Sequence, residues 1–158
     1  MSILPYSRYI VAALTALAFA APAAAQEPAA EMQAEIAVVK GFVDSFFKNL
    51  TNKAIGGDGA VRGIIGNSPL KNRTDDINKL IEQAASLDRN YGAYTGHEEA
   101  SVRVVGKDLI FLRYLYKGER FPVVWHFTFY RPGGNGTRPR EWTLIGLKFD
   151  SKVEVLDR

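Results

Sequence analysis

The sequence predicts an α+β domain in which two to three N-terminal helices pack on a curved four-stranded antiparallel sheet. Between residues 31 and 91, apolar side chains recur every three or four positions, which is the period of an amphipathic helix. From about residue 98 onward, apolar and polar side chains alternate, which is the period of a half-buried strand. Helices followed by a run of strands with short turns are typical of the α+β class.

Residues 1–25 have the pattern of a secretory signal peptide. Residues 1–9 carry one arginine and no acid, residues 10–25 are largely apolar, and Ala23 and Ala25 form the A-x-A arrangement of a cleavage site. The apolar stretch is shorter than the ~20 residues that a membrane-spanning helix needs. We therefore expect cleavage after Ala25, export to a bacterial periplasm and no stable membrane anchor. Residues 26–34 are expected to be a mobile lead-in, and residues 35–156 the folded domain.

The composition excludes several classes of protein. Of the 158 residues, 47% are hydrophobic and 23% are charged, as in an ordinary globular domain. The formal net charge of +3 is small and its charges are interspersed, so no nucleic-acid partner is predicted. Because the chain has no cysteine, its stability must come from the hydrophobic core alone.

Two long helices and a short one are predicted before the strands. The first, residues 31–52, has an apolar stripe wide enough to pack on a sheet. The short helix, residues 58–65, ends at Gly66, and no Gly-Lys-Ser/Thr sequence follows that would make a phosphate loop. The second long helix begins at Asn72 or Thr74 and ends at Tyr91. The two stripes are Met32, Ile36, Val39, Val43, Phe46 and Leu50, widened by Val38, Phe42 and Phe47, and Ile77, Leu80, Ile81, Ala84, Leu87 and Tyr91.

Four strands are expected at residues 98–106, 108–117, 121–131 and 141–150. A Gly118–Glu119 turn would pair Tyr116 with Phe121 and Tyr114 with Val123, and an even loop length fixes which side chains share a face. The predicted core face is Ala100, Val102, Val104, Ile110, Leu112, Tyr114, Tyr116, Phe121, Val123, Trp125, Phe127, Phe129, Thr143, Ile145, Leu147 and Phe149. The other face is Glu99, Ser101, Arg103, Phe111, Arg113, Leu115, His126, Thr128, Tyr130, Trp142 and Lys148.

This order of elements, ending in "WTLIGLKFD", resembles the NTF2-like superfamily. The stretch "YGAYTGHEEASVRVVGKDLIFLRYLYKGERFPVVWHFTFYRP" followed by "WTLIGLKFD" is similar to small exported NTF2-like proteins of unassigned role. The resemblance covers about residues 35–150 and implies a cone with a pocket between helices and sheet. It implies either binding and scaffolding or an isomerase-like or dehydratase-like activity based on pocket carboxylates or a histidine–aspartate pair.

Two surfaces are candidates for binding. Large aromatic side chains with polar tips could line a mostly apolar ligand cavity, although close packing favours a filled core. Leftover aromatic area on the mixed face of the sheet indicates a homodimer interface. The predicted ligand-binding residues are Tyr91, Tyr94, Tyr114 and Trp125, with Tyr116 beside them, and the predicted interface residues are Phe111, Arg113, His126 and Trp142.

No catalytic residue, metal or cofactor is predicted. The neighbours expected around His126 are Arg113 and Lys148, which would lower its pKa and give no carboxylate to orient it. The "HEE" sequence from His97 cannot converge on one metal ion because consecutive strand residues point to opposite faces. The sequence therefore favours an exported, non-catalytic binding or interaction module. The alternative is a cavity enzyme, with Asp44, Glu82 and His97 as its candidate acid–base groups.

Overall fold

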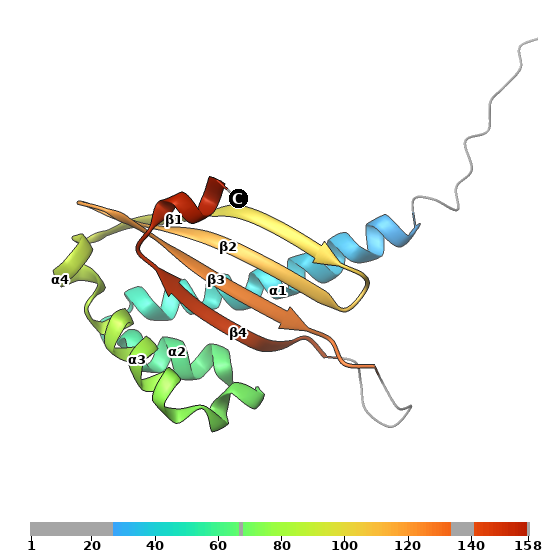
Figure 1. Ribbon diagram of the computed structural model, residues 1–158, viewed down its shortest axis with the longest axis horizontal. Helices are drawn as coiled ribbons and strands as arrows, with labels where there is room; N and C mark the ends of the chain where they lie inside the picture. The colour runs from blue at the N-terminus through green and yellow to red at the C-terminus, as the bar shows by residue number, and fades with distance from the viewer. Residues whose placement is uncertain (1–26, 67, 134–140, 158) are drawn as a thin grey trace, which may run out of the picture.

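The computed structural model describes residues 27–66, 68–133 and 141–157. Four α-helices precede four strands, and the helices pack on one face of the sheet (Figure 1). The predicted α+β class, with helices on a four-stranded antiparallel sheet, is confirmed. The predicted signal peptide lies outside the described residues. The elements are α1 (Glu27–Thr51), α2 (Gly56–Ile65), η2 (Pro69–Asn72), α3 (Thr74–Ala85), α4 (Leu87–Tyr91), β1 (Tyr94–Val105), β2 (Leu109–Gly118), β3 (Pro122–Tyr130), β4 (Thr143–Asp150) and η3 (Val153–Asp157).

The helices differ from the prediction at two places. Helix α1 begins at Glu27, so most of the stretch predicted as a mobile lead-in is helical, in keeping with its Ala, Glu, Met and Gln content. The second long helix is broken at Ser86 into α3 and α4. The Ser86 hydroxyl donates a hydrogen bond to the Gln83 carbonyl oxygen, a local bond that competes with helical geometry. Gly92 ends α4 with a φ of 89°, a conformation that favours glycine.

The β2–β3 hairpin has the predicted faces but a different register. Tyr116 pairs with Val123 and Tyr114 with Trp125, which leaves a four-residue turn from Gly118 to Phe121. The predicted pairing of Tyr116 with Phe121 is wrong by two residues, an even shift that keeps each side chain on its face. Phe121, predicted in the core, is 63% exposed in the turn.

The turn is fixed by backbone bonds to the segment before β1. The amide groups of Arg120 and Phe121 donate to the Tyr91 carbonyl oxygen at 2.9 and 3.2 Å. A Cβ atom on Gly118 would lie 2.4 Å from the same Tyr91 oxygen, so only glycine fits this approach.

Bulges in the two edge strands changed the predicted faces at their ends. In β1 the register shifts between Glu99 and Ser101, which turns Glu99 toward α1 and leaves Ala100 exposed. In β4 the register shifts opposite Thr128 and Phe129, so Leu144 is buried and Ile145 is exposed. The prediction is wrong for Glu99, Ala100, Thr143, Ile145 and Trp142, and correct for Leu147 and Phe149, which face the core.

The core lies between α1 and the inner face of the central strands. The Phe46 ring makes edge-to-face contacts with Trp125 and Phe127, with centroids 5.0 and 5.4 Å apart. On the opposite face, η3 lies against β3, and Val124 is fully buried there although its strand alternation points it away from α1 (Figure 1). This second face of the sheet is therefore covered at one end and open at the other.

Candidate functional site

The four predicted ligand-binding residues do not form one site. Tyr114 and Trp125 are buried among the aromatic side chains of α1 and β3, where the Tyr114 ring lies 5.7 Å from Phe47. Tyr91 contacts Phe149, with centroids 5.9 Å apart, and Phe149 pairs with Trp125 across β3 and β4. Tyr94 lies at the start of β1, the opposite edge strand, with its ring 5.2 Å from that of Tyr116. Burial raises the pKa of Tyr114 and of Tyr116, so both phenols stay protonated at neutral pH.

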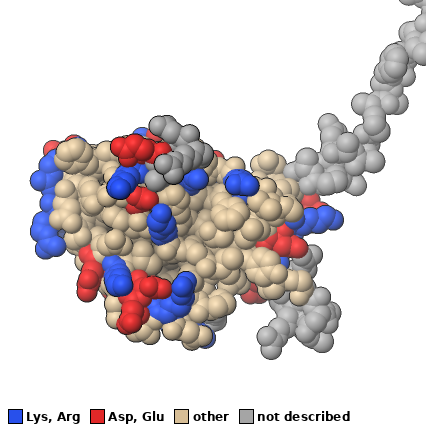
Figure 2. Space-filling view, viewed as in Figure 1, with Lys and Arg blue, Asp and Glu red and all other residues tan. Residues whose placement is uncertain are grey.

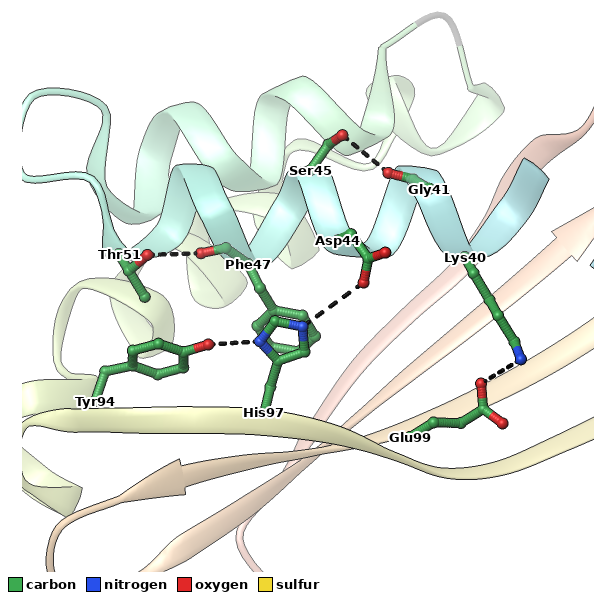
Figure 3. A network of polar contacts seen from close by, with 9 residues as sticks. All are labelled: Lys40, Gly41, Asp44, Ser45, Phe47, Thr51, Tyr94, His97 and Glu99. Carbon is green, nitrogen blue, oxygen red and sulfur yellow. Dashed lines mark hydrogen bonds and ion pairs between the residues drawn. The ribbon is translucent and has the colours of Figure 1, made fainter. Parts of the chain in front are cut away.

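A chain of polar contacts joins α1 to β1 beside this core (Figure 3). The bulge in β1 and its early start at Tyr94 place His97 under α1, where its ring stacks on Phe47 with centroids 4.2 Å apart. His97 Nε2 lies 3.6 Å from Asp44 Oδ1, and His97 Nδ1 lies 2.5 Å from the Tyr94 hydroxyl. One helical turn before Asp44, Lys40 Nζ lies 2.7 Å from Glu99 Oε2.

Two of the three acid–base candidates therefore come together, and Glu82 does not join them. Glu82 is exposed on α3, whereas Asp44 and His97 face each other across the α1–β1 junction. Both imidazole nitrogens already have partners, and burial raises the pKa of the Tyr94 phenol, which weakens it as a proton donor. The chain Asp44–His97–Tyr94 is thus suited to fixing α1 on β1. Its geometry does not leave an imidazole nitrogen directed at a substrate.

An open cleft of about 340 Å³ lies between α1, α2 and the start of β4. Phe42 stands at its entrance, 43% exposed, and its ring stacks on Phe129 with centroids 6.0 Å apart. Ser45 and Asn49 continue from Phe42 along the same side of α1. The lining of the cleft combines apolar side chains with several polar ones. Its lining includes Phe42, Phe46, Ile64, Ile65, Phe129, Trp142 and Leu144, with Ser45, Asn49, Ser68, Glu141 and Thr143.

Trp142 forms one wall of this cleft, which corrects its predicted place on the mixed face. It is 9% exposed on the helix side of β4, and its indole Nε1 donates to Glu35 Oε2 at 2.6 Å. The Arg131 guanidinium lies 4.9 Å from the centre of the Trp142 ring and bonds the other oxygen of Glu35. Arg131 Nε is also 3.5 Å from Asp108 Oδ1. Trp142 therefore shares no face with Phe111, Arg113 and His126.

The other three predicted interface residues do share the open face of the sheet. Arg113 pairs with His126, and His126 pairs with Lys148 on β4. Burial lowers the pKa of His126 from its usual 6.5, and the charges of Lys148 and Arg113 lower it further, whereas Asp150 raises it. The predicted direction of the shift is confirmed, but a carboxylate that the sequence analysis did not foresee lies close by.

The lowered pKa of His126 predicts that stability decreases as pH falls below 6.5. In this range the unfolded chain binds a proton that the folded chain does not, so protonation favours unfolding until pH reaches the lowered folded pKa. His126→Gln should flatten the free energy of unfolding over this range. The pKa of Asp150 is lowered from its usual 3.8 because the Lys152 amide donates a hydrogen bond to its carboxylate. The stability that Asp150 contributes is therefore lost only as pH falls below 3.8, outside the range of His126. Urea unfolding at a series of pH values measures the free energy of unfolding across both ranges. If it depended on pH as strongly in His126→Gln as in the unchanged protein, His126 would not be the group responsible.

The sequence analysis missed the residues that bind α1 to the end of the sheet. Neither Glu35 nor Arg131 was among the candidate residues of the sequence analysis. A signal was present in Trp142, whose indole nitrogen usually has a hydrogen-bond acceptor when its ring is buried. The buried Ser68, whose hydroxyl donates to the Leu144 carbonyl oxygen, carried no such signal.

Within the described ranges, no helix is long and apolar enough to cross a bilayer, and no group of three or more His, Cys, Asp or Glu side chains has the placement of a metal site. Comparisons with known proteins add no assignment: no family model, no curated protein and no solved structure matches the chain at a significant level.

Proposed function

We propose that the protein is an exported, non-catalytic binding module that holds a small, mostly apolar ligand in the cleft between α1, α2 and β4. The observation that carries the proposal is Phe42, an aromatic side chain that is 43% exposed and lines a cleft of mixed apolar and polar character. Transfer of this ring from water to a ligand contact would stabilise a complex. The NTF2-like assignment belongs to the same proposal and is supported by the order of elements quoted above.

The lining restricts the chemistry of the ligand. A volume of about 340 Å³ is at the lower end of the range of ligand pockets. Among the described residues that line the cleft, Glu141 is the ionisable one, while Ser45 and Asn49 offer neutral polar groups. Because a carboxylate repels anions and none of the described lining residues is a cation, the occupant is neutral or cationic, with a small polar group near Ser45 and Asn49.

Phe42→Ala should weaken the binding of the neutral fluorescent probe N-phenyl-1-naphthylamine by about tenfold, because it removes one large apolar contact. Phe121→Ala is the matched control, since Phe121 is more exposed than Phe42 and lies in the β2–β3 turn away from the cleft. Titration of probe fluorescence measures the affinity. Energy transfer from Trp142 in a Trp125→Phe background places the probe at the cleft.

Three results would contradict the proposal. These are equal binding of the probe to both alanine variants, no energy transfer from Trp142, and tighter binding of dodecanoate than of the neutral probe. The last result would mean that an anion is preferred, which the Glu141 rim does not support.

The enzymatic alternative is supported by one observation, the Asp44–His97 pair. It is the weaker candidate because Tyr94 occupies the second imidazole nitrogen and the cleft described above is lined by other residues.

Self-association is the second candidate function. It is supported by large apolar side chains left exposed at the open end of the outer sheet face, next to Arg103 and Arg113: Val105 is 43% exposed, Phe111 37% and Tyr130 41%. Figure 2 shows this region as a broad surface with few charges, whereas the surface over α2 and α3 carries charges of both signs. Sedimentation velocity over a range of protein concentrations tests it, and a constant monomer mass would exclude a stable dimer through Phe111, Arg113 and His126.

A further inference from the structure

Strand β4 is an edge strand, and α3 runs beside its outer edge (Figure 1). Near its start, the Leu144 carbonyl oxygen receives the Ser68 hydroxyl, and η2 covers this part of the edge. Farther along, in the part of the chain that the structure describes, β3 pairs with one edge of the stretch from Gly146 to Asp150, and no backbone hydrogen bond from any other element reaches it. An edge with open backbone groups is a template for another extended chain.

The edge borders a groove that continues past the end of α3. One section of about 300 Å³ lies between α3 and β4, and a second section of about 470 Å³ adjoins it at Gln83, Lys148 and Phe149. The floor of the first section is apolar and partly exposed, made by Leu80 of α3 together with Leu147 and Phe149 of β4. A groove between a helix and a free strand edge has the shape that an extended peptide needs.

The charges around the groove define the chemistry of such a peptide. Arg73, Lys79 and Lys148 line the first section, against the single acid Asp76. The Lys148 side chain is 67% exposed on the outer face of the sheet, where its ammonium pairs with Asp150 at 3.2 Å, whereas Leu147 and Phe149 point to the helix side. In a strand added next to β4, alternate side chains would therefore meet the apolar floor and the Lys148 ammonium.

We propose that the groove between α3 and β4 binds an extended peptide of a partner protein by strand addition to β4. The peptide has apolar side chains at alternate positions, directed at Leu80, Leu147 and Phe149, and acidic side chains between them, directed at Lys148. This site is separate from the small-ligand cleft, which lies on the other side of Ile65.

The test uses a capped, fluorescein-labelled Val-Glu-Val-Glu-Val-Glu hexapeptide and the folded chain, with binding measured by fluorescence anisotropy. We expect a Kd below about 1 mM. Lys148→Glu should weaken binding by about tenfold because an attraction opposite the peptide carboxylates becomes a repulsion. The same variant should bind a Val-Lys-Val-Lys-Val-Lys peptide more tightly than the unchanged protein does. Lys53→Glu, a charge reversal at an exposed lysine between α1 and α2, should leave both affinities unchanged.

Two further probes separate strand addition from charge attraction. A peptide N-methylated at alternate amides keeps its charge but cannot form the ladder, so it should not bind. A peptide with the sequence Val-Val-Val-Glu-Glu-Glu should bind less tightly because its alternation is lost. Slowed amide exchange in the stretch Gly146–Asp150 should accompany binding of the first peptide. Equal binding of the N-methylated probe, no exchange protection at β4, or edge-to-edge dimers of the protein itself would each overturn the proposal.

Discussion

Trp125→Ala is expected to lower the free energy of unfolding by about 3–5 kcal/mol, the range found when a buried tryptophan is truncated. The side chain has no exposed surface and contacts Phe46 of α1 and Phe149 of β4. Its removal would leave a cavity between the helix and the sheet, because the aromatic rings around it cannot collapse without leaving their own partners. Urea unfolding followed by far-ultraviolet circular dichroism measures the loss.

The matched variant is Trp125→Phe, which should change stability far less. The buried indole Nε1 of Trp125 has no hydrogen-bond partner within the described residues. A phenyl ring keeps most of the apolar contact and removes the unsatisfied donor, so the lost volume and the relieved polar group offset each other. If Phe were as damaging as Ala, the indole nitrogen would have to make a hydrogen bond in solution.

Glu35→Ala is expected to cost about 2–3 kcal/mol, somewhat below the range for a fully buried ion pair. The side chain of Arg131 is only 11% exposed and that of Glu35 24% exposed, so deletion of the carboxylate leaves a guanidinium with little access to water. The same deletion removes the acceptor of the Trp142 indole. Thermal and urea unfolding both measure the effect.

Two controls isolate the cause. Glu31→Ala changes an exposed carboxylate one turn earlier on α1 and should alter stability by less than about 0.5 kcal/mol. Glu35→Gln keeps an acceptor for Trp142 but removes the negative charge. Its loss of stability should therefore lie between those of Glu31→Ala and Glu35→Ala. A loss of stability in Glu31→Ala equal to that in Glu35→Ala would mean that helix propensity, and not the Arg131 contact, explains the result.

The sequence predicted the fold well where the apolar side chains keep one period along a whole helix or strand. The period-2 pattern identified the inner face of β2 and β3 because those central strands pair with each other without a register shift. A four-residue turn replaced the expected two-residue turn without changing any face, since the difference is even. Backbone hydrogen bonds to the Tyr91 carbonyl oxygen hold this turn in place, and such bonds cannot be predicted from the pattern of side chains.

The errors have a common physical origin in the edge strands. A bulge adds one residue, and every side chain beyond it changes face, yet Ala100 and Ile145 have no sequence feature that marks a bulge. The candidate site was harder to predict for the same reason. Trp142 moved from the outer face to the cleft wall, and His97 moved under α1 beside Asp44. Phe42 was predicted as part of the buried stripe, and only the position of α2 decides that its ring is left at the entrance of a cleft.

The contact of Glu35 with Trp142 also has a consequence for how the chain folds. It joins residues 107 positions apart, and the Arg131–Glu35 and Ser68–Leu144 contacts span 96 and 76 positions. Such distant pairings require large loops to close before they contribute, which slows folding. Because Glu35 of α1 pairs with Arg131 and Trp142, an emerging chain cannot satisfy this carboxylate until the segment just before β4 has been made. A chain that ends before Arg131 therefore lacks both partners of Glu35.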